Sequence, residues 1–295
     1  MNKQAILIMY HTDYYILERL LKQIDNKCFD IYLHVDKKVL DFDFEYTRKI
    51  IKNSNIYFVN RKNVKWSHFS QIECELNLLK EATKRDYSYY HLLSGNDLLL
   101  KSSDDIYKFF QDNYGSEFVA YSNMDMISED QLSRIKYYHV LNCNRRHSNT
   151  IVRKISNKIY YRFLTIQKIF KINRLKNIKL DIRKGANWFS ITDKLAKYVL
   201  SCEKDIFKLF RYSNCADELF LQTIVYNSEF KDKVYNKYND EHKNTLRYID
   251  WNRGEPYTFK IDDYDLLMNS GCFFARKFSS NIDKNIIDKI YKTYR

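Results

Sequence analysis

The chain has 295 residues, of which 45% are hydrophobic, and its formal net charge at pH 7 is +13. This length fits one large domain or two small ones, and the apolar content is enough to bury a substantial core. A single proline and five glycines argue against long disordered or collagen-like segments.

The positive charge is concentrated in one part of the chain. The stretch from Arg145 to Lys184 contains thirteen lysines and arginines and a single acid, Asp181. The remainder is therefore close to neutral, which favours one basic face over a general nucleic-acid-binding surface.

The N-terminus and the cysteines predict a cytoplasmic protein. The first apolar run, Ala5–Met9, begins too early to leave room for a signal peptide, and no window approaches the roughly 18 to 20 apolar residues that span a bilayer. The six cysteines are scattered without a CxxC pair, so we expect neither a zinc site nor disulfides.

The first 38 residues have the pattern of a βαβ unit. Ala5–Met9 is a continuous apolar strand, an amphipathic helix follows, and Asp30–Lys38 alternates like a second strand. Such units form parallel sheets, whose ligands bind beyond the carboxyl ends of the strands. His11 and Asp36 fall at those ends, where Asp36 can accept the N–H of a uracil base or can simply start a loop.

Strands and helices continue to alternate up to about residue 121. The pattern predicts a strand at Ile56–Asn60, a turn at Val64–His68, a helix at Ser70–Ala82, a strand at Tyr89–Leu100 broken by Ser94-Gly95-Asn96-Asp97, a helix at Ser103–Asn113 and a strand at Glu117–Tyr121.

A basic amphipathic helix interrupts this alternation. Apolar residues recur at steps of three or four from Ile151 to Phe170, flanked by lysines and arginines. Such a helix either packs on its own domain with its cations in water, or lies on an anionic membrane or guides an anionic substrate. The segment has no helix-turn-helix pattern, so we expect no nucleic-acid partner.

Two later stretches contain charged residues that could act in catalysis or in ligand binding. In Asn214–Thr223 the adjacent Asp217 and Glu218 open an apolar helical run, and a carboxylate at a helix N-terminus either caps the helix or faces a cleft. Glu218 is our candidate catalytic base. Near the C-terminus, the basic pair Arg276 and Lys277 either binds phosphate or lies at the surface.

The order of these motifs resembles that of glycosyltransferase family 14, the core-2/I-branching β-1,6-N-acetylglucosaminyltransferases and the related peptide O-xylosyltransferases. The basic segment between Arg145 and Arg183 matches more loosely than the rest. The segments that carry the resemblance, in order along residues 5–278, are AILIMYH, DIYLHVDKK, VKWSHFSQIECELNLLKEA, YYHLLSGNDLLLKS, KGANWFSIT, CADELFLQTI and LRYIDW with FARKF.

The resemblance implies an α/β fold of the GT-A nucleotide-sugar type, with a mostly parallel central sheet and flanking helices. It implies one domain over residues 1–295, made of a nucleotide-binding half (1–125), a basic helical insertion (145–184) and an acceptor-binding and catalytic half (185–295). The reaction is then an inverting single displacement on a UDP-sugar, with Glu218 as the base and Asp217 orienting or capping beside the acceptor sugar.

The resemblance also assigns residues to the donor and acceptor. His11, Asp36, Trp66 and Ser67 match positions near the uridine pocket. Trp188 matches a position where a sugar would stack, although a core tryptophan beside Phe189 is the alternative.

The resemblance likewise implies that basic side chains, and not a metal ion, neutralise the diphosphate. Lys277 is the expected phosphate ligand, and its partner is one of Arg247, Arg253 and Lys260, of which we take Arg253. Asp97 is the only carboxylate of its turn, and one acid is a poor divalent site.

The sequence does contain an Asp-x-Asp motif, at Asp41-Phe42-Asp43. This motif lies in the loop after the second strand and not at the position expected of a metal site, so we expect no metal cofactor.

The expected function is transfer of a sugar, in first place N-acetylglucosamine, to a glycan or lipid-linked glycan in bacterial surface polysaccharide synthesis. We expect a cytoplasmic protein, peripheral on the inner face of the plasma membrane through residues 145–184. The alternatives are an O-xylosyltransferase activity, or a non-catalytic lectin-like protein of the membrane surface.

Overall fold

A computed structural model describes residues 2–122, 127–142, 149–236 and 241–294. Its central sheet has the strand order β3-β2-β1-β4-β6, in which the first four strands are parallel and β6 is antiparallel to β4. The strands of this sheet are β1 (Gln4–Tyr10), β2 (Phe29–Val35), β3 (Asn55–Phe58), β4 (Tyr89–Ser94) and β6 (Ser190–Thr192). The expected α/β architecture with a mostly parallel sheet is confirmed.

A smaller sheet lies beside the carboxyl end of β4. It has the order β5-β8-β7, and its strands are β5 (Leu98–Leu99), β7 (Arg247–Ile249) and β8 (Phe274–Arg276). Because β5 follows β4 after a turn of three residues, the C-terminal strand β8 is brought next to the edge where the first sheet ends.

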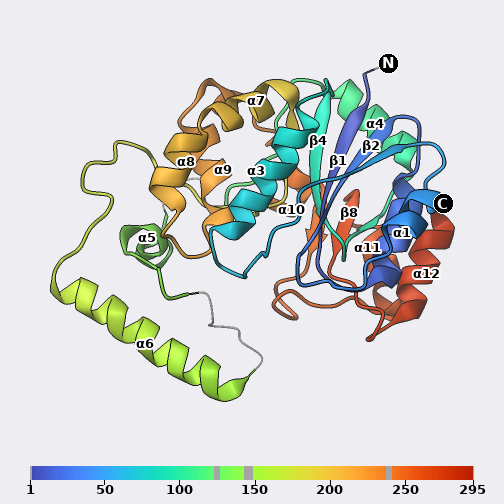
Figure 1. The fold of residues 1–295 in the computed structure, drawn as a ribbon. Helices are drawn as coiled ribbons and strands as arrows, with labels where there is room; N and C mark the ends of the chain where they lie inside the picture. The colour runs from blue at the N-terminus through green and yellow to red at the C-terminus, as the bar shows by residue number, and fades with distance from the viewer. Residues whose placement is uncertain (1, 123–126, 143–148, 237–240, 295) are drawn as a thin grey trace.

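Helices cover both faces of the central sheet (Figure 1). No helix in the described parts of the chain is long and apolar enough to cross a membrane. The helices are α1 (Tyr14–Ile24), α2 (Phe44–Ile50), α3 (Ser70–Ala82), α4 (Ser103–Asp112), α5 (Glu129–Lys136), α6 (Thr150–Ile169), α7 (Asp193–Ser201), α8 (Glu203–Phe210), α9 (Phe220–Tyr226), α10 (Glu241–Thr245), α11 (Tyr264–Met268) and α12 (Lys284–Thr293).

Neighbouring residues of the central strands pack into different cores. In β1, Ala5 and Leu7 join a cluster with α3 and with α7 to α9, whereas Ile6 and Ile8 join a second cluster with α1, α4 and α12. A parallel strand that is buried on both faces needs apolar side chains throughout. This explains why the first strand reads as a continuous apolar run and not as an alternating one.

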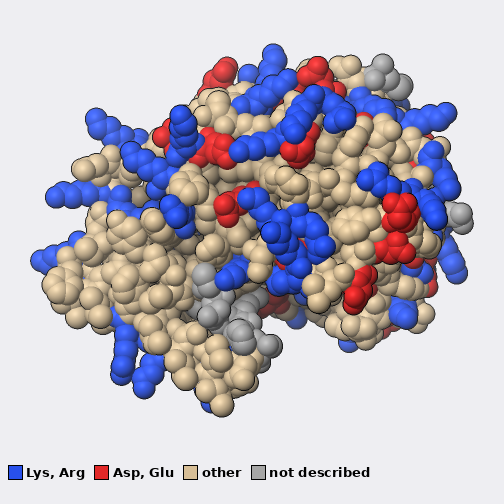
Figure 2. All heavy atoms as spheres, in the orientation of Figure 1, with Lys and Arg blue, Asp and Glu red and all other residues tan. Residues whose placement is uncertain are grey.

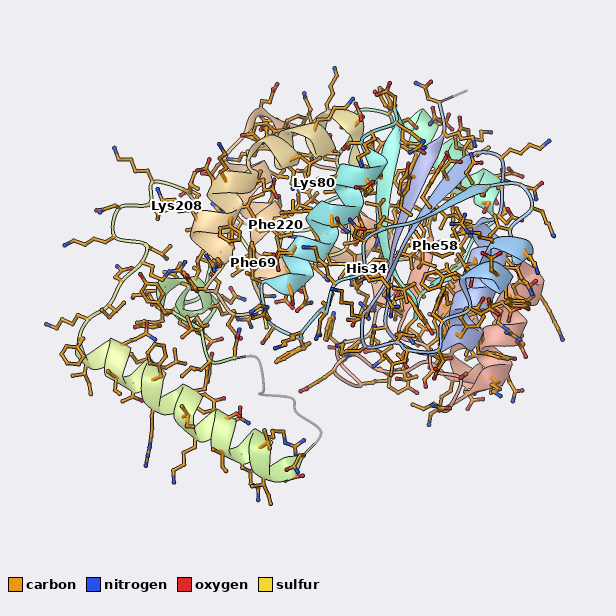
Figure 3. The ribbon with its side chains drawn as sticks, viewed as in Figure 1. His34, Phe58, Phe69, Lys80, Lys208 and Phe220 are labelled. Carbon is orange, nitrogen blue, oxygen red and sulfur yellow. The ribbon has the colours of Figure 1, made fainter. Side chains whose placement is uncertain are left out.

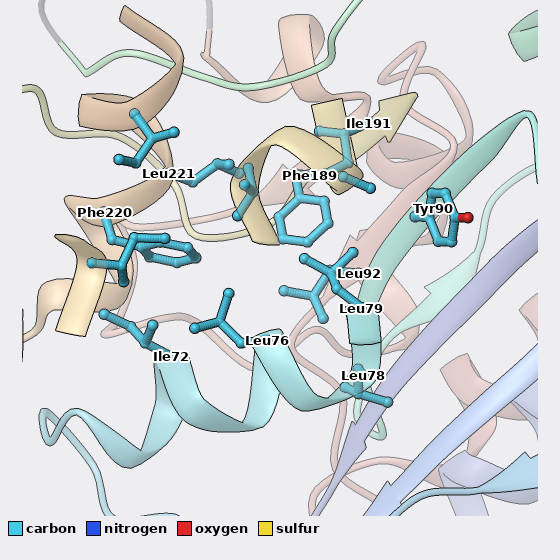
Figure 4. Close-up of a cluster of buried hydrophobic side chains, with 14 of the residues drawn as sticks. Ile72, Leu76, Leu78, Leu79, Tyr90, Leu92, Phe189, Ile191, Phe220 and Leu221 are labelled. Atoms are coloured by element: carbon cyan, nitrogen blue, oxygen red, sulfur yellow. The ribbon is translucent and has the colours of Figure 1, made fainter. Parts of the chain in front are cut away.

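The first cluster connects α3 to the sheet and to the later helices. Figure 4 shows Leu76 and Leu79 of α3 facing Leu92 of β4. Phe69 and Phe220, which belong to the same cluster, lie on this side of the molecule (Figure 3). The packing fixes the start of α9, and therefore the residues just before it, relative to the central sheet.

The structure confirms two of the predicted helices and contradicts one predicted strand. The helix at Ser70–Ala82 is confirmed, but the expected strand at Glu117–Tyr121 is wrong, because only isolated bridges to Val234 and Ser190 form there. The predicted basic helix is confirmed as α6, while residues 145–148 of the predicted insertion lie outside the described residues.

Arg247 joins the two sheets. Its guanidinium donates to the carbonyl oxygen of Thr245 at 2.6 Å, to that of Leu92 at 3.3 Å, to Ser190 Oγ at 3.0 Å and to the carbonyl oxygen of Phe189. The residue is 3% exposed, and burial lowers the pKa of its guanidinium to about 9. Arg247 is therefore engaged in holding the fold and does not face solvent, where a diphosphate would bind.

We expect Arg247→Met to lower the free energy of unfolding by about 3 kcal/mol, because it leaves buried carbonyl groups of both sheets without their donor. Urea denaturation measures this change. The control Arg153→Met removes an exposed arginine of α6 and should change the stability by less than about 0.5 kcal/mol. Equal effects of the two substitutions would contradict the bridging role.

Candidate active site

Three polar residues meet at the carboxyl edge of the central sheet. His11 follows β1, Asp36 follows β2 and Asp97 lies in the turn after β4. Tyr10 pairs with Val35 and Met9 pairs with Ser94 in parallel register, so the three strands end side by side. This is the edge at which ligands of parallel α/β sheets bind.

His11 lies in a mainly cationic environment at this edge. Its side chain reaches solvent, yet its pKa is lowered, first by partial desolvation and then by Lys38, Arg276 and Lys277, while Asp36 opposes the shift. The neutral imidazole is thus favoured. The charges of Asp36 and Lys277 thus both act on His11, and the assignment of the three residues to a donor site stays a prediction.

Asp36 is 2% exposed and organises the loop that follows β2. Its Oδ1 accepts the backbone N–H of Lys38 at 2.9 Å, and its Oδ2 accepts that of Val64 at 3.1 Å. Lys38 Nζ lies 3.5 Å from Oδ2. These contacts are those of a loop-forming aspartate, so recognition of a base by Asp36 stays a prediction.

Asp97 and Arg276 form an ion pair beneath this edge. Asp97 accepts from the backbone N–H of Ser94 at 2.9 Å and from Ser94 Oγ at 2.6 Å, and Arg276 Nε lies 3.5 Å from its Oδ1. Burial raises the pKa of Asp97, while Arg276 opposes this. The guanidinium of Arg276 also lies 4.4 Å from the ring centre of Trp188.

Trp188 is 6% exposed and belongs to the core. With Arg276 on its ring, its placement favours the core role, and stacking on a sugar stays a prediction. Trp66, in contrast, is 44% exposed and offers ring surface to a ligand.

Ser67 connects the Trp66 turn to the acidic turn. It is 1% exposed with a positive φ of 60°, and its carbonyl oxygen accepts the backbone N–H of Cys215 at 3.0 Å. Its backbone N–H donates to Gln71 Oε1 at 2.8 Å. The Ser67 hydroxyl is buried without a hydrogen-bond partner among the described residues.

Asp217 is buried and forms an acidic pair with the buried Glu75. Gln71 Nε2 donates to its Oδ2 at 2.9 Å. Burial raises the pKa of Asp217 to about 7, and the charge of Glu218 adds to the shift. The carboxyl of Glu75, one turn further along α3, also has a strongly raised pKa, because it is fully buried and Asp217 is near. Among the described residues Asp217 accepts from Gln71 and makes no hydrogen bond that caps α9, so its orienting role beside the acceptor stays a prediction.

Glu218 differs from its neighbour because it reaches solvent and contacts two cations. Its side chain is 32% exposed, Arg134 Nη1 donates to Oε2 at 2.9 Å, and Lys184 Nζ lies 3.4 Å from the same oxygen. Its carbonyl oxygen accepts the backbone N–H of Gly185 at 3.0 Å. The 3-10 turn Ala216–Glu218 thus presents one carboxylate outward and one inward.

Arg253 is held by two carboxylates. Its Nε lies 2.6 Å from Asp250 Oδ2 and its Nη1 lies 2.7 Å from Asp263 Oδ1. Its side chain is 41% exposed. A diphosphate would have to compete with both acids for Arg253, and the roles of Arg253 and Lys277 as phosphate ligands stay predictions.

The Asp41-Phe42-Asp43 motif serves the fold. Asp43 Oδ1 accepts the backbone N–H of Tyr46 at 2.8 Å and caps α2, and Phe42 is buried. Within residues 2–122, 127–142, 149–236 and 241–294, no three His, Cys, Asp or Glu side chains group as metal ligands. The structure therefore gives no reason to assign a metal site to this motif.

A groove of about 300 Å³ lies beside the stretch that leads to Lys184. Asp181 and Arg183 are its only charged lining residues, and its apolar lining consists of Ile127, Leu132, Leu175, Ile178, Leu180 and Ile182. Its lining residue Leu132 lies on α5, the helix that also carries Arg134, and its lining residue Arg183 directly precedes Lys184.

Sequence reasoning missed Glu75 and Arg134. Glu75 had a visible signal, since it lies at a helical step from the apolar Ile72 and Leu79 and is thus a charged residue on a core-facing stripe. Arg134 had none, because nothing local to its short helix indicates that it contacts a residue 84 positions away.

The comparisons identify a family over most of the chain. The family model of the Core-2/I-Branching enzyme matches residues 5–267. No curated protein matches significantly.

Solved structures resemble the chain only weakly. S. aureus TarS is 15% identical over 46% of this chain and 24% of that chain, with a TM-score of 0.29. The apo-form glycosyltransferase GlyE of Streptococcus pneumoniae TIGR4 is 13% identical over 72% of this chain and 44% of that chain, with a TM-score of 0.24. The chain thus spans less than half of either protein, and at these TM-scores neither supports an argument.

The raised pKa of Asp217 predicts a pH-dependent stability difference. The folded state keeps a proton that the unfolded state releases between about pH 4 and the folded pKa of about 7. The folded state binds more protons in this window, so wild-type stability falls as pH rises. Asp217→Asn removes this loss and retains an acceptor for Gln71.

We therefore expect Asp217→Asn to gain stability relative to wild type between about pH 4 and pH 8, by at most about 4 kcal/mol. Urea denaturation at a series of pH values measures the difference. Asp205→Asn, on the exposed side of α8, should show none. Parallel stability curves for Asp217→Asn and wild type would refute the buried acidic pair.

Proposed function

The chain belongs to the Core-2/I-branching enzyme family, and from this premise we propose that it is an inverting, UDP-sugar-dependent glycosyltransferase of the GT-A class. It transfers a sugar, in first place N-acetylglucosamine, to a hydroxyl of a glycan acceptor with β linkage. The observation that carries the proposal is the acidic turn, where Glu218 is held at the surface by Arg134 and Lys184.

Glu218 acts as the base. As the acceptor oxygen bonds to the anomeric carbon, its proton passes to the Glu218 carboxylate, and the bond between that carbon and the UDP oxygen breaks on the opposite face. Both cations contact Oε2, which fixes the carboxylate and leaves Oε1 to accept the proton. A base must lie within hydrogen-bond reach of the hydroxyl, and the 32% exposure of the Glu218 side chain leaves it accessible to an acceptor.

The diphosphate leaves with its charge met by basic groups at the carboxyl edge of the sheet. Preorganised charge is the largest single source of stabilisation in such reactions. Lys277 is the direct phosphate ligand, and Arg253 joins it by exchanging its carboxylate partners for phosphate. His11, Asp36, Ser67 and Asp97 complete the donor side, and the exposed ring of Trp66 covers the nucleotide.

Trp188 forms the floor between the donor side and the acceptor side. Asp217 supports the acceptor side from below through Gln71. Because Asp217 is buried with a raised pKa, it is unsuited to hold a negative charge at the acceptor, and this separates its role from that of Glu218.

The acceptor is a glycan or a lipid-linked glycan used for bacterial surface polysaccharide. The reaction then takes place in the cytoplasm, at the inner face of the plasma membrane. UDP-xylose as donor is the alternative within the same mechanism, and a screen of UDP-sugars for UDP release distinguishes the donors.

We expect Glu218→Gln to lower the rate of sugar transfer by at least about 100-fold, because the amide cannot take the acceptor proton. Binding of UDP should stay within about twofold of wild type, since the nucleotide does not contact this residue. Transfer is measured as UDP release in the presence of acceptor, and UDP binding by calorimetry.

Glu229→Gln is the matched control, because Glu229 is an exposed glutamate paired only with Lys233, and it should transfer like wild type. Unchanged transfer by Glu218→Gln would refute the base. Absence of transfer in wild type with every UDP-sugar, together with binding of glycans, would favour the lectin-like alternative.

We expect transfer to persist in excess EDTA at a rate within about twofold of that without chelator, because side chains and not a divalent ion meet the diphosphate charge. The same UDP-release assay measures it. Loss of activity that added Mg²⁺ or Mn²⁺ restores would overturn metal independence, and Asp41→Asn would then test the Asp-x-Asp motif.

A further inference from the structure

Within the part of the chain that the structure describes, helix α6 is attached through the face that carries Tyr160 and Gln167. Tyr160 OH lies 2.7 Å from His139 Nδ1, and Gln167 exchanges two hydrogen bonds with the backbone of Tyr138, at 2.8 and 2.9 Å. Tyr160 and Gln167 are the buried residues of this helix. They lie seven positions apart, so they share one face and fix the roll of the helix.

A stripe of isoleucines faces away from this attachment. Ile151, Ile155, Ile159 and Ile166 are 70%, 54%, 51% and 50% exposed. Their spacing puts them on one side of the helix over about 22 Å, between about a quarter and a half of a turn from Tyr160 and Gln167. Figure 3 shows side chains of α6 extending away from the rest of the molecule. Apolar side chains in such a row are not explained by the fold.

The same helix is strongly cationic. Six exposed lysines and arginines lie along it and just beyond its end, and no Asp or Glu occurs from residue 149 to residue 180. Figure 2 shows blue but no red atoms around the place of α6. The cations are Arg153, Lys154, Lys158, Arg162, Lys168 and Lys171.

A partner that covers α6 must accommodate both the exposed isoleucines and the positive charge, and this requirement distinguishes the possible partners. A second copy of the chain would bury the isoleucines, but it would bring two all-cationic helices together without counter-charges. A nucleic acid would neutralise the cations and leave the isoleucines in water. An anionic bilayer satisfies both, because its interface accepts apolar side chains and its headgroups attract lysine and arginine.

We propose that α6 lies flat on an anionic membrane, with the isoleucine stripe below the headgroups and the cations that flank it, Lys154, Lys158 and Arg162, at their level. The chain enters α6 after Arg134 and leaves it toward Lys184, the two cations on Glu218. The residues that hold α6, Tyr138 and His139, follow shortly after α5, the helix that carries Arg134, so a short segment connects the proposed membrane contact to a cation of the acidic turn. Binding itself does not depend on the proposed transfer reaction.

Flotation of the full chain with vesicles tests the proposal. Vesicles of phosphatidylcholine with about 30% phosphatidylglycerol should bind the wild type at least about tenfold more than pure phosphatidylcholine vesicles, and high salt should weaken the binding. Ile155→Gln with Ile159→Gln, and separately Lys154→Gln with Lys158→Gln, should each lower the partition coefficient at least about fivefold.

The matched control is Lys204→Gln with Lys208→Gln, which removes an exposed pair of the same spacing from α8 and should bind like wild type. Thermal melting and UDP release without acceptor should be unchanged in all three double variants, which separates membrane binding from folding and from the transfer chemistry. In a second measurement, Ile159→Trp should be quenched by brominated lipid in anionic vesicles.

Two results would overturn the proposal. One is a wild type that ignores anionic vesicles at low salt, or isoleucine variants that bind as tightly as wild type, since binding would then lack insertion. The other is a wild-type dimer in solution that the isoleucine substitutions dissociate, since a second copy would then cover the stripe.

Discussion

The site depends on the close contact between Gly185 and the backbone of Ala120. A Cβ atom at position 185 would lie 1.8 Å from the carbonyl oxygen of Ala120, so only glycine lets the chain pass there. The segment that starts at this point makes most of the connections of the site. Lys184 contacts Glu218, Trp188 packs on Arg276, and the carbonyl oxygen of Phe189 accepts from Arg247. The spacing between the acidic turn and the basic strand β8 therefore follows from one stretch of backbone.

Burial determines which of the two adjacent acids, Asp217 or Glu218, is ionised more easily. Asp217 and Glu218 are adjacent, but a 3-10 turn points the first into the core beside Glu75 and the second toward two cations and solvent. Desolvation opposes ionisation of the buried pair. The same reasoning separates Arg247, which is enclosed by protein acceptors, from Arg276 and Lys277, whose charges both act on His11 at the sheet edge.

The sequence predicted those features that periodicity and strand ends determine. The parallel βα pattern placed His11 and Asp36 at one edge, and the helical steps of α3 and α6 gave both helices. Short helices such as α2 and α5 were not predicted, because they have too few residues to show a helical period of apolar side chains. The contact between Arg134 and Glu218 could not be predicted for another reason. The two residues are 84 positions apart, and only tertiary packing brings them together. The apparent strand at Glu117–Tyr121 was wrong because apolar β-formers indicate burial without fixing a paired neighbour.

The distribution of charge along the sequence also bears on how the protein folds. A net charge of +13 would oppose compactness if it were spread over the fold. Most of it lies instead in the segment that contains α6, the helix with the least burial among the long helices. Charge repulsion is thereby kept away from the core, where the cations that remain are each opposed by a carboxylate or by carbonyl groups. The helix that carries the charge also exposes its isoleucines. The anionic membrane surface that we propose for α6 would accommodate both features.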